Sequence, residues 1–114
     1  MNRVLLALCL LPLLVSPVLA HATLVKSTPA KGARVASPKE ITLRFSEALE
    51  PAFSGALLLD QDGRNVSGAP VKVNGQTIIL MPGPLLPGVY HVNWHSVSRD
   101  THKLEGDFSF TVKP

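Results

Sequence analysis

Short segments of alternating apolar and polar residues, separated by turn signals, make up the chain after its first twenty residues. In the segment EITLRF, the side chains of Ile41, Leu43 and Phe45 face one side of an extended strand, because successive strand residues point to opposite faces. The same period of two recurs in residues 88–97 and 106–112. No long segment has the 3.6-residue period of an amphipathic helix. The pattern therefore predicts an all-β protein.

Turn residues divide these segments. Asp62-Gly63 and Asn74-Gly75 are dipeptides typical of tight hairpin turns, because they adopt positive φ angles easily. Prolines lie mostly between the segments, where a missing backbone donor is tolerated. We expect a single sandwich or barrel, immunoglobulin-like but without a disulfide. The predicted core consists of Leu43, Phe45, Leu57, Leu59, Ile79, Tyr90, Val92, Trp94, Phe108, Phe110 and Val112.

Residues 1–20 have the pattern of a secretory signal peptide. A basic Arg3 precedes the apolar stretch VLLALCLLPLLV, which is shorter than the roughly 20 residues of a membrane-spanning helix. The sequence VLA at its end favours cleavage before His21, whereas the overlapping AHA favours cleavage before Thr23. We favour the first, which divides the chain into a signal peptide, 1–20, and one domain, 21–114.

Composition limits what the exported domain can be. The lone cysteine of the whole chain, Cys9, would leave with the signal. Residues 21–114 must therefore fold around one hydrophobic core without disulfides. The whole chain has a formal net charge of +3, with acidic and basic residues interspersed. With no basic run and few aromatic residues, the sequence gives no support for nucleic-acid binding.

Histidines and carboxylates are the candidate metal ligands. Asp100 and His102 are two residues apart, so in an extended segment both side chains project to the same side. Such a pair is also common in solvated loops, where the aspartate caps a turn. His91 and His95 lie roughly 13 Å apart along a regular strand and could not share one metal ion.

Cleavage before His21 would give this histidine a free α-amine, whose pKa of about 7.7–8.0 lets it lose a proton near neutral pH. The amine and the imidazole Nδ1 could then chelate one metal, with a further histidine nitrogen completing the set. Nitrogen and oxygen ligands in a tetragonal arrangement favour Cu(II), with tetrahedral Zn²⁺ as the competitor. A blue-copper or methionine-rich Cu(I) site is excluded, because residues 21–114 contain no cysteine and one methionine, Met81.

Three segments, in this order, resemble the CopC family of periplasmic copper-binding proteins: HATLVKSTPAKG, ITLRFSEALEPAFSG and GVYHVNWHSVSRDTHKLEGDFSFTV. The resemblance implies a Greek-key β-barrel or sandwich and a periplasmic location. It also implies a histidine-brace-type Cu(II) site formed by His21, Glu47, Asp100 and His102. The residues alone gave no reason to choose Glu47 over Glu50 or Glu105. Family members with a Cu(I) site carry a methionine-rich loop, which residues 57–73 lack.

We therefore expect a monomeric, non-enzymatic protein that binds one Cu(II) for sequestration, resistance or delivery. The resemblance suggests an inner-membrane copper importer of the CopD kind as its partner. One alternative is a copper-dependent redox enzyme resembling lytic polysaccharide monooxygenases, although a single Trp and a single Tyr offer little platform for a polysaccharide. The other alternative is a metal-free interaction module.

Overall fold

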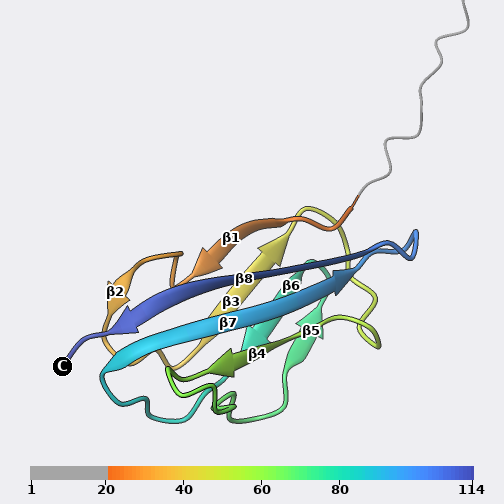
Figure 1. Ribbon diagram of the computed structural model, residues 1–114. Coiled ribbons are helices and arrows are strands. Elements are labelled where there is room, and N and C mark those ends of the chain that lie inside the picture. Colours follow the sequence, from red (N-terminus) through yellow and green to blue (C-terminus); the bar gives the residue numbers. More distant parts are fainter. Residues whose placement is uncertain (1–20) are drawn as a thin grey trace, which may run out of the picture.

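The computed structural model describes residues 21–114, so the predicted signal peptide lies outside the described residues. Between residues 21 and 114 the chain forms strands and turns, and it contains no helix with the length and apolarity needed to cross a membrane. Figure 1 shows the strands as two packed layers. In chain order they are β1 (Leu24–Thr28), β2 (Arg34–Val35), β3 (Ile41–Phe45), β4 (Gly55–Leu59), β5 (Lys72–Asn74), β6 (Thr77–Leu80), β7 (Gly88–Val97) and β8 (Lys103–Val112).

Each layer is a four-stranded sheet, with the order β1-β3-β6-β5 in one and β2-β8-β7-β4 in the other. The short β2 pairs with β8 in parallel, and the other pairs are antiparallel. The chain changes sheet at most of its connections, which is the crossing pattern of a Greek-key sandwich. The predicted all-β, immunoglobulin-like class is confirmed.

The core lies between the sheets and follows the predicted alternation where the sequence alternates clearly. Leu58 of β4 pairs with Val92 of β7, and both side chains are fully buried. The predicted core residues that are buried are Leu43, Phe45, Tyr90, Val92, Phe108, Phe110 and Val112.

Three predicted core residues were wrong by one position. Leu57 is 46% exposed, and Leu59 and Ile79 are half-buried. They lie in uninterrupted apolar runs, where alternation cannot define which face turns inward, and a shift of one residue exchanges the faces. The buried residues of these strands are Leu58, Ile78 and Leu80.

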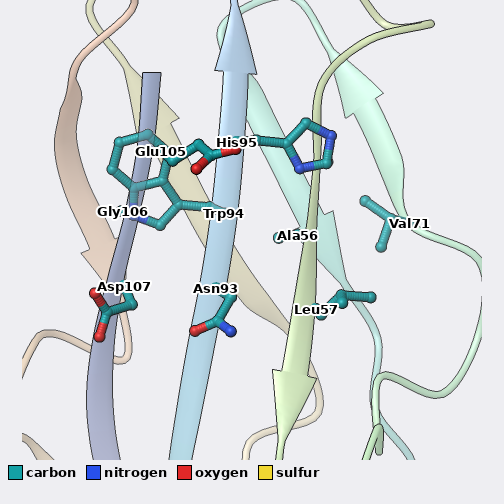
Figure 2. Close-up of a pocket in the computed structure, with 10 residues that line it drawn as sticks. Ala56, Leu57, Val71, Asn93, Trp94, His95, Glu105, Gly106 and Asp107 are labelled. Carbon is teal, nitrogen blue, oxygen red and sulfur yellow. The ribbon is translucent and has the colours of Figure 1, made fainter. Parts of the chain in front are cut away.

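Trp94 is half-buried rather than central. Its indole packs edge-to-face on the buried Phe45, with ring centroids 5.2 Å apart. It also lies against Gly106 of β8, its partner in the β7–β8 pairing (Figure 2). A Cβ on Gly106 would lie 2.6 Å from the indole Cε2, so this position accepts glycine because the ring occupies the space of a side chain.

Both predicted turns form, with the glycine supplying the positive φ. At the first, Asn74 ends β5 and the turn shifts by one residue to Gly75-Gln76, with Gly75 at φ +61°. Asp62-Gly63 reverses the chain after β4, and Gly63 has φ +79°. There the carboxylate of Asp60 accepts hydrogen bonds from the backbone of Asp62 and Arg64, which stabilises the turn.

Candidate metal centre

The long β7–β8 hairpin ends in the turn 98–102, which carries Asp100 and His102. The backbone N–H of Thr101 donates to the carbonyl of Ser98 at 2.9 Å, and the N–H of Ser98 donates to the carbonyl of His102 at 3.3 Å. Thr101 has φ +69°, a left-handed conformation that costs a β-branched residue about 1–2 kcal/mol. The tight reversal places the side chains of Asp100 and His102 together.

Asp100 is oriented by three groups of this turn. The hydroxyl of Ser98 and the backbone N–H of His102 both donate to its Oδ1, and Nδ1 of His102 lies 3.2 Å from its Oδ2. The Ser98 hydrogen bond, followed by that from the His102 backbone, lowers the pKa of Asp100 below its ordinary value of 3.8. Asp100 is therefore a carboxylate at neutral pH, as a metal ligand requires.

His21, at the start of the described chain, lies beside this turn. Its carbonyl accepts a hydrogen bond from the hydroxyl of Ser46, which follows β3. The next residue, Ala22, is fully buried in the core, and its carbonyl accepts a hydrogen bond from Ser96 of β7 at 2.7 Å. The start of the described chain is thus tied to both sheets.

His21, Asp100 and His102 converge: one ligand atom from each lies within 4.8 Å of the others. The imidazoles of His21 and His102 meet edge-on, with centroids 4.9 Å apart. Nδ1 of His21 is buried without a hydrogen-bond partner. Such a nitrogen costs about 1–3 kcal/mol unless something else binds it. Two imidazoles, one of them with an unpartnered nitrogen, and a carboxylate fit a divalent transition-metal ion.

The other candidate ligands lie outside this cluster. Glu47 is exposed and follows Ser46, but its carboxylate is not among the converging ligand atoms. Its role as a ligand stays a prediction. Glu105 instead pairs with Lys103, at 2.9 Å, and this hydrogen bond lowers the pKa of Glu105. His91 and His95 lie on β7, between β4 and β8, and neither contributes to the converging ligand atoms.

Apart from the ligand cluster, a hollow with a volume of about 820 Å³ lies over β4, β7 and β8 (Figure 2). It is open and lined by both polar and apolar residues, and it includes none of the converging ligands. The residues lining it include Leu57, Asn93, Trp94, His95, Glu105 and Asp107.

Three serines that hydrogen-bond to the candidate site or to the segment beside it had no signal in the sequence: Ser46, Ser96 and Ser98. A serine in or beside a strand is ordinary, and its hydroxyl acquires a partner through tertiary structure. For Ser96 that partner is the carbonyl of Ala22, which only the folded chain brings within reach.

Comparison with known protein families found a match over most of the chain. The family model described as the CopC domain matches residues 24–113. The chain belongs to the CopC family. The match spans all eight strands and the turn that carries Asp100 and His102.

Similar proteins cover most of the described chain. Protein YobA of Escherichia coli K12 is 44% identical over an alignment of 106 positions that covers 88% of this chain and 86% of YobA. The crystal structure of CopC from Methylosinus trichosporium OB3b superposes with a TM-score of 0.76 at 35% identity, covering 82% of this chain and 95% of that one. PcoC, a methionine-rich copper resistance protein from Escherichia coli, superposes with a TM-score of 0.74 at 38% identity, covering 82% and 100%.

Proposed function

We propose that this CopC-family protein binds one Cu(II) ion in the periplasm, through the mature N-terminus and the turn 98–102. The ligands would be the α-amine and Nδ1 of His21 and one nitrogen of His102, with Asp100 as an oxygen ligand or hydrogen-bonding neighbour. Two observations carry the proposal: Nδ1 of His21 is buried without a partner, and one ligand atom each from His21, Asp100 and His102 lie within 4.8 Å of one another.

Cu(II), rather than Cu(I), suits these donors. Imidazole, amine and carboxylate are ligands for Cu(II), whereas Cu(I) prefers thiolates and thioethers. Met81 is the one methionine after the predicted signal, and it follows the end of β6 that pairs with Ile41, whereas His21 contacts Ser46 beyond the opposite end of β3. PcoC is described as methionine-rich, and this chain differs from it in that respect. We therefore assign no Cu(I) site.

Cleavage before His21 is supported by the packing of the next residue. Ala22 is 0% exposed and belongs to the core. Cleavage before Thr23 would remove Ala22 and leave the buried hydroxyl of Ser96 without its acceptor. An unsatisfied buried hydroxyl is unfavourable, so the domain is more stable when it begins at His21.

Glu47 takes an outer role in this proposal. It adjoins Ser46, whose hydroxyl donates to the carbonyl of His21. Its carboxylate would balance the charge of the bound ion, and outer groups of this kind tune the ligands that they face. We expect its removal to weaken copper binding less than removal of His102.

The proposed role is binding, for resistance, sequestration or delivery, with an inner-membrane copper transporter of the CopD kind as the partner. We assign no catalytic residue. An oxygen-activating enzyme would produce peroxide or oxidised sugars when the copper-loaded protein receives a reductant, and that assay separates the two functions.

The direct test is equilibrium dialysis of the processed protein, of verified mass, against Cu(II) and against equimolar Cu(II) and Zn²⁺. The proposal expects one tightly retained copper per chain, preferred over zinc, and a loss of orders of magnitude in affinity for His102→Ala. Because His102 is exposed, this variant should keep its fold. Retention of no copper by the wild-type chain would leave a metal-free interaction module as the better description.

A further inference from the structure

Ser96 is a fully buried polar residue near the end of β7 that leads into the turn 98–102. It lies on β7, and its hydroxyl donates to the carbonyl of Ala22 at 2.7 Å. Ala22 leads into β1, which belongs to the opposite sheet. The hydrogen bond therefore connects the two sheets one residue after His21.

Ser46 holds the same segment from the other side. Its hydroxyl donates to the carbonyl of His21 at 3.0 Å and accepts a hydrogen bond from the N–H of Thr23, also at 3.0 Å. Successive carbonyls of an extended chain point in opposite directions. The carbonyls of His21 and Ala22 are thus each held by a serine, one beside β3 and the other on β7.

Such anchoring matters for a terminal ligand. The first residues of a domain are usually poorly ordered unless they are tied down, and ordering them on binding costs conformational entropy. A chelate from the amine and Nδ1 of one residue also needs its backbone to keep a fixed orientation toward His102. Both serines restrain peptide groups next to His21 without belonging to the ligand set.

We propose that Ser46 and Ser96 are positioning residues, which pre-organise His21 so that its amine and imidazole meet His102 at the copper ion. This inference rests on the proposed function of the site. It assigns to two ordinary serines the role that outer-shell groups have in other metal sites, where they orient the ligands.

The test compares Cu(II) affinity, by chelator competition, and the Cu(II) electron paramagnetic resonance spectrum across five variants of the exported, processed protein. Ser46→Ala and Ser96→Ala should each lower affinity by roughly 10–100-fold and change the spectrum. Ser46→Thr, which keeps the hydroxyl at an exposed position, should retain wild-type values. Ser27→Ala is the matched control, because Ser27 also donates to a backbone carbonyl, that of Pro29, but at the far end of β1.

Because Ser46 is exposed, its variants keep the test decisive even if Ser96→Ala does not fold. Wild-type affinity and spectrum in Ser46→Ala would overturn the positioning role, and so would an equal loss in Ser27→Ala. His102→Ala, measured in the same series, separates the two proposals. If it binds copper as tightly as the wild type, the proposed site itself is wrong. If it loses copper while Ser46→Ala does not, the positioning role alone fails.

Discussion

The imidazole of His102 meets that of His21 edge-on, with centroids 4.9 Å apart and ring planes at 88°. One ring stands at the first residue of the predicted mature chain, and the other in the turn between the last two strands. A metal ion held by both would therefore link the N-terminal segment to the β7–β8 hairpin. Copper binding and stability should be coupled for this reason.

Saturating Cu(II) should raise the melting temperature of the processed protein, because a ligand bound by the native state alone stabilises it. At a free concentration of 100 times the dissociation constant, the gain is about 2.7 kcal/mol. His102→Ala should unfold at nearly the wild-type temperature without copper and show almost no rise with it. Calorimetry checks this, and an equal rise in the variant would contradict the assignment of His102 as a ligand.

Asp100→Asn should destabilise the metal-free protein at neutral pH, but not in strong acid. Hydrogen bonds, foremost that from Ser98, lower the pKa of Asp100 in the folded state below 3.8. The carboxylate therefore contributes stability above its unfolded pKa, and this contribution is lost as the pH falls through the folded pKa. Urea unfolding of both proteins across this range should show the difference shrinking below about pH 4. A difference that does not depend on pH would show that charge on Asp100 is not involved.

Gly106→Ala should destabilise the fold by about 1–3 kcal/mol, because the new methyl group would overlap the indole of Trp94. Urea unfolding followed by tryptophan fluorescence measures this, and the spectrum of Trp94 should itself change. Gly83→Ala is the matched control, since a Cβ there meets nothing within 4 Å. Equal stabilities for the two variants would mean that the indole moves aside without cost.

Thr101→Gly should leave stability unchanged or raise it by up to about 1 kcal/mol, since glycine adopts positive φ without the steric cost that threonine has. Thr111→Gly, in the regular strand β8, is the control and should lose stability, because glycine weakens strand interiors. Thermal unfolding of the metal-free proteins distinguishes the two. If Thr101→Gly loses as much as Thr111→Gly, the left-handed conformation is not a source of strain.

The sequence allowed the fold class to be predicted wherever apolar and polar residues alternate, as in β3, β7 and β8. It was insufficient for the runs LLL and II, where Leu58 and Ile78 turn inward in place of Leu57 and Ile79. Local spacing indicated that Asp100 and His102 act together. The contact of His21 with them, and its support by Ser46 and Ser96, depend on tertiary packing that no local pattern encodes.

The central claim is that a freed amine at His21 is a copper ligand, and a comparison of chains 21–114 and 17–114 tests it most directly. The longer chain keeps both imidazoles and Asp100 but replaces the amine of His21 by an amide. We predict that Cu(II) affinity falls by more than the roughly 10–100-fold cost of losing an outer-shell group, and that the nitrogen hyperfine pattern changes. Equal affinity and identical spectra for the two chains would contradict the claim.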